Sequence, residues 1–334
     1  MVNNLMSIFR AGYKKFIFGI FLTVALSYVL LSRIRLTDLS QALTSFHLRT
    51  LVVAVGILLA MNFLKSYRFS RLLHESVSFR NLSPLVFIHN FYILFMPSRS
   101  GELAYPYMLK QKYGLGLGQS LSSLIVARVL DVIIILLLIA GTIIIGFRDQ
   151  AETITGFFPL MIFGLAVLLA GLFLILYKGQ WLYESISRQF LRKDIFSKKL
   201  FGKIAHKFME ILQAFSQKHS HGTLIQITLV TIVIWIITFG FEFVLYRGLG
   251  LEISYWQFLV ASLFPVLIHI IPVQSLAGIG TYEASIAGGF VLLGFDLDKV
   301  IPLTFTVHLT FLIMTAIFGF FAFLFYRRIK PVGI

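Results

Sequence analysis

The chain has 334 residues, of which 58% are hydrophobic and only 13% are charged, and its mean hydropathy is +0.89. A soluble globular domain carries roughly a quarter charged residues, so this composition excludes a water-soluble fold and predicts an integral membrane protein. The longest water-compatible stretch, 178–222, is too short for a large catalytic domain, and the lack of cysteine excludes disulfides and thiol chemistry. The net charge of +15 indicates basic loops that meet anionic lipid at the cytoplasmic face, and no nucleic-acid partner is expected.

Six apolar segments are long enough to cross a bilayer. A helix rises 1.5 Å per residue, so about 20 residues cross a hydrocarbon core roughly 30 Å thick. In chain order, the predicted spans are 16–32, 51–73, 121–147, 157–177, 224–246 and 300–326. No small-residue cleavage site follows the first of them, so we expect it to be retained rather than removed as a signal peptide.

Two further apolar stretches are short and interrupted. The stretch 85–96 ends at a proline, and 258–271 ends at a second proline and is followed by glycines. Short apolar segments broken by proline or glycine are typical of re-entrant hairpins rather than of full spans. The residues predicted to break the helices of these two hairpins are Pro97, Gly101, Pro272, Gly278 and Gly280.

The distribution of basic residues predicts the orientation of the chain in the membrane. With both termini in the cytoplasm, the inside loops hold most of the 29 lysines and arginines, as the positive-inside rule requires. The loop 178–222 repeats apolar residues every three to five positions between its basic residues. We expect it to form a basic amphipathic helix pair that lies on the cytoplasmic membrane surface.

This topology gives the two halves of the chain the same order of elements. Residues 1–150 and 151–334 each contain two spans, a hairpin and a third span, with 178–222 inserted in the second half. Three crossings per half turn the second half upside down, so the two hairpins enter from opposite sides. The predicted fold is therefore an all-α polytopic membrane protein with six full spans and two re-entrant hairpins in inverted repeats, an arrangement that points to an alternating-access site.

Two charged residues lie within the predicted span 121–147. A charge inside a bilayer costs about 2.5–3.5 kcal/mol on insertion scales, so it requires an explanation. Arg128 and Asp131 are three residues apart, which places them on one helical face where they can pair. Two interpretations stay open: an internal ion pair that joins helices, or an arginine oriented by Asp131 that binds a phosphate entering from the cytoplasmic leaflet.

The two hairpin tips carry further polar residues. The first tip includes Arg99 and Glu102, and the N-terminus of the helix that follows it favours an anion; the alternative is a solvated turn. The second tip includes Gln274 and Glu283, and here the alternative is that the carboxylate only caps the returning helix. His308 aligns with Arg128 when the two halves are superposed, although a lone intramembrane histidine is more often a packing residue.

No metal-ligand spacing, nucleotide loop or catalytic triad is identifiable, so we expect no metal, no cofactor and no enzymatic activity. The segments Asn90–Ala104, Val126–Asp131 and Gly278–Glu283, with Ile271 before its proline, resemble the membrane region of lysylphosphatidylglycerol synthases. The resemblance covers essentially the whole chain, and its combination of segments is more specific than any one of them.

The resemblance implies translocation of a phospholipid or a polyprenyl-phosphate lipid between leaflets, with these segments lining the path. Ala277 stands where such proteins often have glycine, and Tyr282 where a basic residue is frequent. The soluble aminoacyl-transferring domain of the bifunctional members has no counterpart here, so synthase activity is not expected. The candidate residues of the headgroup path are Arg99, Glu102, Arg128, Asp131, Gln274, Glu283 and His308.

The leading hypothesis is a lipid flippase or lipid transporter in the cytoplasmic membrane, with membrane lipids as its partners. A second hypothesis is an ion-coupled carrier of a small anion, which uses the same architecture. A third is a non-catalytic membrane partner of a glycolipid- or aminoacyl-lipid-synthesising enzyme, which docks through 178–222.

Overall fold

The computed structural model describes residues 21, 23–26, 28–29, 44–96, 101–146, 221–270 and 275–329. The predicted span 157–177, most of the predicted span 16–32 and nearly all of the loop 178–222 lie outside these described residues. Four predicted site or hairpin residues also lie outside them: Pro97, Arg99, Pro272 and Gln274.

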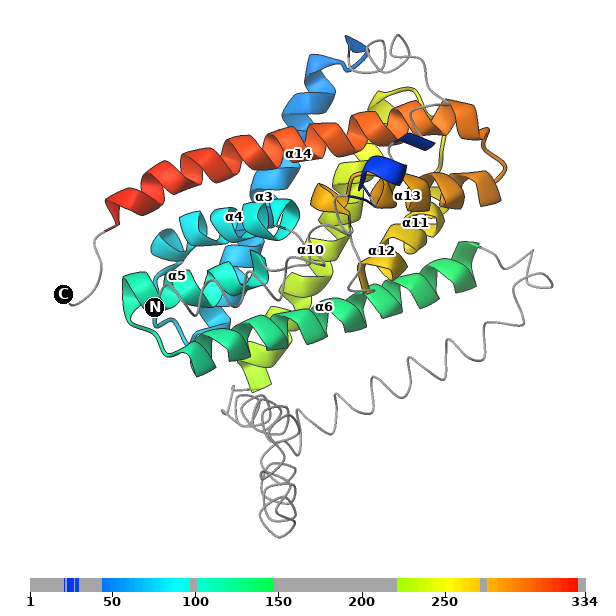
Figure 1. The fold of residues 1–334 in the computed structure, drawn as a ribbon. Helices are drawn as coiled ribbons and strands as arrows, with labels where there is room; N and C mark the ends of the chain where they lie inside the picture. Colours follow the sequence, from blue (N-terminus) through cyan, green and yellow to red (C-terminus); the bar gives the residue numbers. More distant parts are fainter. Residues whose placement is uncertain are drawn as a thin grey trace, which may run out of the picture. The chain divides into compact units, whose positions relative to one another are not determined.

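Secondary structure within the described ranges is entirely helical (Figure 1). The helices are α3 (Leu48–Leu72), α4 (Phe79–Phe95), α5 (Ala104–Tyr113), α6 (Leu117–Gly146), α10 (His221–Gly248), α11 (Tyr255–Ala261), α12 (Leu263–Ile270), the short 3-10 helix η4 (Leu276–Gly278), α13 (Thr281–Leu292) and α14 (Leu297–Arg328).

Four of these helices, α3, α6, α10 and α14, are long and apolar enough to cross a membrane. They coincide with the predicted spans 51–73, 121–147, 224–246 and 300–326, and each begins about three or four residues earlier than predicted. At α14 the cause is visible, because the carboxylate of Asp296 accepts a hydrogen bond from the backbone N–H of Asp298 and caps the helix ahead of its apolar part.

The chain forms two compact units. Every statement below about a unit concerns the described residues of that unit. Unit 1 comprises Met1–Phe63, Ser83–Tyr105 and Ile236–Ile329, and unit 2 comprises Leu64–Leu82, Pro106–Trp235 and Lys330–Ile334. Both predicted repeats, 1–150 and 151–334, contribute residues to both units. Their inverted symmetry stays a prediction.

The core of unit 1 is aromatic where α10, α11 and α13 meet. Tyr246, Phe258 and Phe290 are fully buried, and the ring of Tyr246 lies 5.7 Å from that of Phe258 and 5.1 Å from that of Phe290. A Cβ atom at Gly289 would lie only 2.5 Å from the carbonyl oxygen of Ala261. The glycine therefore lets the backbones of α13 and α11 approach closely, and α13 also packs against α12 and α14.

In the same unit, the start of α5 runs antiparallel to the end of α4. A Cβ atom at Gly101 would overlap the carbonyl group of Tyr92, so the chain at 101 lies directly on the backbone of α4. Four residues later, the ring of Tyr105 lies 5.2 Å from His89, one turn earlier in α4. Close approach, rather than left-handed backbone geometry, is what requires glycine at 101.

The segment before α13 contains left-handed backbone. Gly278 and Gly280 have φ angles of 74° and 88°, which glycine adopts without steric cost. Ala277 has a φ of 52°, a conformation that disfavours any residue with a Cβ. This local geometry ends η4 and turns the chain into α13.

Candidate functional site

Three spanning helices contribute side chains to a polar cluster in unit 2, centred on Asp131 of α6. Arg68 of α3 donates two hydrogen bonds to this carboxylate, Nη1 to Oδ1 at 2.6 Å and Nη2 to Oδ2 at 3.3 Å. Only 3% of the Arg68 side chain and 8% of the Asp131 side chain are exposed. The planar guanidinium and the carboxylate thus form a buried bidentate ion pair, the strongest kind of side-chain hydrogen bonding.

Helix α10 completes the contacts of this pair. The indole Nε1 of Trp235 donates to Asp131 Oδ1 at 3.0 Å, and Arg68 Nη1 donates to Thr231 Oγ1 at 3.2 Å. The Thr231 hydroxyl uses its own hydrogen to bond the carbonyl of Ile227 at 2.6 Å, so its oxygen is available to accept from Arg68. One carboxylate therefore links α3, α6 and α10.

Arg128 also pairs with Asp131, but more loosely than Arg68 does. Its Nη1 lies 3.6 Å from Asp131 Oδ2, beyond hydrogen-bond distance, and 40% of its side chain is exposed. The sequence pattern predicted Arg128 as the partner of Asp131 and overlooked Arg68. Arg68 could have been singled out, because it too is a charge within a predicted span, 51–73.

Lys65 adds a third positive charge to this region. It precedes Arg68 by one helical turn and interacts electrostatically with Asp131, Arg68 and Arg128. Among the described residues, three basic side chains thus interact with one carboxylate, a surplus of two positive charges within this group. We call Lys65, Arg68, Arg128, Asp131, Thr231 and Trp235 the Arg68–Asp131 cluster.

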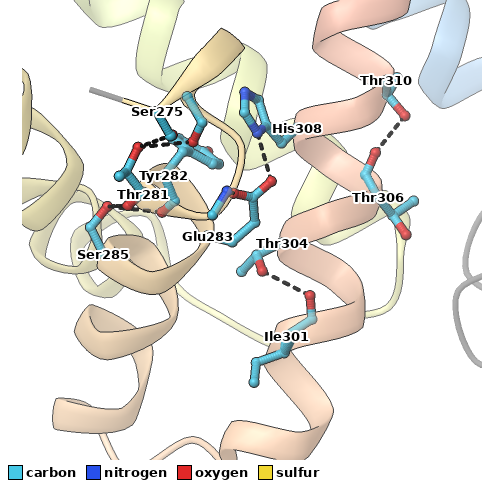
Figure 2. Close-up of polar contacts among 12 residues, drawn as sticks. Ser275, Thr281, Tyr282, Glu283, Ser285, Ile301, Thr304, Thr306, His308 and Thr310 are labelled. Atoms are coloured by element: carbon cyan, nitrogen blue, oxygen red, sulfur yellow. Dashed lines mark hydrogen bonds and ion pairs between the residues drawn. The ribbon is translucent and has the colours of Figure 1, made fainter. Parts of the chain in front are cut away.

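A second polar cluster lies in unit 1, around Glu283 of α13 (Figure 2). His308 Nδ1 of α14 is hydrogen-bonded to Glu283 Oε1 at 2.7 Å, and the two side chains are only 5% and 1% exposed. The other carboxylate oxygen accepts from the backbone N–H of Gly280 at 2.6 Å. Glu283 therefore caps α13, one of the two roles considered for it from sequence, and also pairs with His308, which was not predicted. Its place on a headgroup path stays a prediction.

Tyr282 extends this cluster to α10. Its ring lies 4.6 Å from the imidazole of His308, and its hydroxyl donates to Glu242 Oε2 at 3.0 Å. Tyr246, on the same helix as Glu242, is fully buried and interacts electrostatically with Glu242 and Glu283. We call Glu242, Tyr246, Tyr282, Glu283 and His308 the Glu283–His308 cluster.

The candidate site residues from sequence are thus distributed over two units. Arg128 and Asp131 come together in unit 2, and Glu283 and His308 come together in unit 1. Glu102 belongs to unit 1 and is partly buried at the turn before α5. Within the described residues, no group of three or more histidine, aspartate and glutamate side chains has the arrangement of a metal site.

Long apolar helices with buried ionic clusters define a multi-pass helical membrane protein. Residues 16–319 match the family model described as the lysylphosphatidylglycerol synthase TM region, and the chain belongs to this family. Membership links the chain with lipid metabolism or lipid transport. A search of curated proteins found no match.

Proposed function

We propose that this protein moves a phosphate-bearing lipid between the leaflets of the membrane, with the Arg68–Asp131 cluster as its headgroup site. The observation that carries the proposal is the gathering of three basic side chains around Asp131 on apolar helices, counted over the described residues. Positive charge within a membrane is costly, and an anionic headgroup would lower that cost. The family's link with lipids favours a lipid phosphate over other anions.

The two arginines have different parts in this proposal. Arg68 is held by Asp131 and Thr231, and its buried Nε has no hydrogen-bond partner among the described residues, so an oxyanion would satisfy it. Arg128 lies farther from Asp131 and is half exposed, so its guanidinium can contact a phosphate while the Arg68–Asp131 pair stays intact. Arg99, at the first tip, is proposed as a further contact.

The proposed architecture is the one expected from sequence: six spans and two re-entrant hairpins in inverted repeats, in the cytoplasmic membrane with both termini inside. Helices α11 and α12 together extend roughly 24 Å and α13 about 18 Å, less than the hydrocarbon thickness of about 30 Å. Both α11 and α12 pack against α13, as the arms of a hairpin do. The antiparallel start of α5 on α4 supports the first hairpin in the same way.

Transport without a catalytic step is part of the proposal. A carrier of small anions would use the same surplus of positive charge, so the test must separate a lipid phosphate from a free phosphate. A protein that only assists a lipid-modifying enzyme would move neither of them. These alternatives are therefore distinguished by what crosses the membrane.

The test uses the full-length protein in liposomes that contain NBD-labelled phosphatidylglycerol, an anionic lipid, with dithionite quenching of the outer leaflet. Hydrogen bonds to charged groups contribute about 1.5–3 kcal/mol, so Arg128→Gln should slow translocation by about tenfold or more. Arg247→Gln is the matched control, because Arg247 is an exposed arginine at the end of α10, outside the cluster. Unchanged translocation in Arg128→Gln refutes the site, and uptake of radiolabelled inorganic phosphate without lipid movement identifies an anion carrier instead.

A further inference from the structure

The Glu283–His308 cluster holds more negative than positive charge. It contains two carboxylates, Glu242 and Glu283, and a single imidazole, so even with His308 protonated one negative charge remains. Within the described residues, neither carboxylate forms an ion pair with a lysine or arginine. Among the residues that the structure describes, the other titratable groups facing this pair are Tyr282 of α13 and Tyr246 of α10, and the apolar Phe258 of α11 lies against Tyr246.

The groups of the cluster are connected from one carboxylate to the other. Glu283 bonds His308, the His308 ring lies against Tyr282, and the hydroxyl of Tyr282 donates to Glu242. The buried hydroxyl of Tyr246 stands beside this chain of groups and interacts with Tyr282 and Glu242.

The hydrogen bond between Glu283 and the backbone allows the charge of the Glu283–His308 pair to change without loss of the helix cap. Its Oε2 accepts from Gly280 N–H whether or not His308 carries a second proton, so α13 stays capped in both states. The imidazole also lies close to the backbone of Gly278, where an added Cβ would be 3.5 Å from Cε1 and 3.7 Å from Nε2. The edge of the ring that carries its second nitrogen therefore faces Gly278.

We propose that the Glu283–His308 cluster is a proton-binding site that couples lipid movement to a proton gradient. This inference rests on the proposed function. One proton from water binds to Nε2 of His308 or to the carboxylate of Glu242, which lowers the negative charge of the cluster by one. The same proton leaves to water when the site opens to the other side of the membrane. No oxidant, reductant or metal takes part.

Proton binding is tested first without any transport, by infrared difference spectroscopy of the full-length protein in lipid between about pH 5 and 8. We expect a carboxylic-acid band to appear on acidification and Glu242→Gln to change its size or midpoint. His89→Gln is the matched control, since His89 is also buried in unit 1 but contacts Tyr105. A spectrum that Glu242→Gln, Glu283→Gln and His308→Gln all leave unaltered overturns the proton site.

Coupling is tested in liposomes that carry a pH difference of one unit, with the membrane potential clamped by potassium and valinomycin. One proton per lipid would shift the steady-state leaflet ratio of NBD-labelled phosphatidylglycerol by up to about tenfold. His308→Gln should abolish this shift and His89→Gln should retain it. A leaflet ratio that is unchanged by the pH gradient, or that changes with a sodium gradient instead, overturns the proposed coupling to protons.

The two assays separate this inference from the proposed function. If no lipid moves under any condition, the proposed function is wrong, and the infrared titration alone decides whether the cluster binds a proton. If lipid moves but the titration and the gradient effect are both absent, the proposed function stands and the proton site is wrong.

Discussion

Replacing Asp131 by asparagine removes the carboxylate of the Arg68–Asp131 cluster while keeping its size. The substitution leaves Arg68 buried at 3% exposure, beside Lys65 and Arg128, without a counter-charge. Breaking a buried ion pair by removing one partner costs about 3–5 kcal/mol, because the other charge stays buried and uncompensated. We therefore expect Asp131→Asn to lower the free energy of unfolding by an amount in this range.

Double-mutant cycles show which arginine holds the carboxylate. Arg68 donates two hydrogen bonds to Asp131 in a buried setting, whereas Arg128 lies 3.6 Å away and is 40% exposed. Hydrogen bonds to charged groups contribute about 1.5–3 kcal/mol each, so the coupling energy between Arg68→Met and the Asp131 substitution should be at least about 2 kcal/mol. The coupling energy for Arg128→Met should be below about 1 kcal/mol, as for an exposed ion pair.

The assay is equilibrium unfolding of the full-length protein in mixed micelles, followed by far-UV circular dichroism during a titration with sodium dodecyl sulfate. The double variant Arg68→Met/Asp131→Leu keeps the surplus of two positive charges and removes the buried pair as a whole, so it should recover part of the lost stability. Equal coupling for both arginines, or a larger one for Arg128, would refute the reasoning.

Two further predictions concern the backbone. Gly101→Ala should destabilise the protein by about 1–3 kcal/mol, because the added methyl group would overlap the Tyr92 carbonyl. In the same thermal-unfolding experiment, Gly141→Ala in the interior of α6 should be neutral or stabilising, because among the described residues no neighbouring element lies near the added methyl group. Ala277→Gly should raise the melting temperature or leave it unchanged, since it relieves a left-handed φ of 52°, and Ala287→Gly within α13 should lower it. A loss of stability in Ala277→Gly as large as in Ala287→Gly would contradict the backbone geometry at 277.

Hydropathy and segment length were sufficient to predict α3, α6, α10 and α14, because a span needs about 20 apolar residues and little else. The ends of the helices were less predictable. Helix α14 begins in a polar stretch because Asp296 caps it, and hydropathy alone does not register a cap that precedes the apolar residues. The packing of Gly101 on α4 could not be predicted from the sequence either, since it depends on a contact across the turn.

The ion pairs show a similar limit. Helical spacing identifies neighbours three or four residues apart, and it therefore found Arg128 for Asp131. Arg68 is 63 residues from Asp131 in the chain, and no periodicity relates positions on different helices. Arg68 lies near the end of α3, where the positive-inside rule alone accounts for a basic residue. Glu242, near the end of α10, was likewise not predicted as a site residue, although it accepts from Tyr282.

The two buried carboxylates look alike in sequence, each an acidic residue in an apolar helix, but their positions along the helix give them different chemistry. Asp131 lies in the interior of α6, where every backbone N–H is used, so only side chains can compensate its charge, and Arg68 of α3, Arg128 of α6 itself and the indole of Trp235 do so. Glu283 lies in the first turn of α13, where the backbone N–H of Gly280 already accommodates one of its oxygens. Asp131 is therefore fixed by surrounding permanent charges, whereas the partner of Glu283 is an imidazole whose charge can change. A helix-interior carboxylate suits the binding of an anion through its arginines, and a helix-capping carboxylate suits a proton.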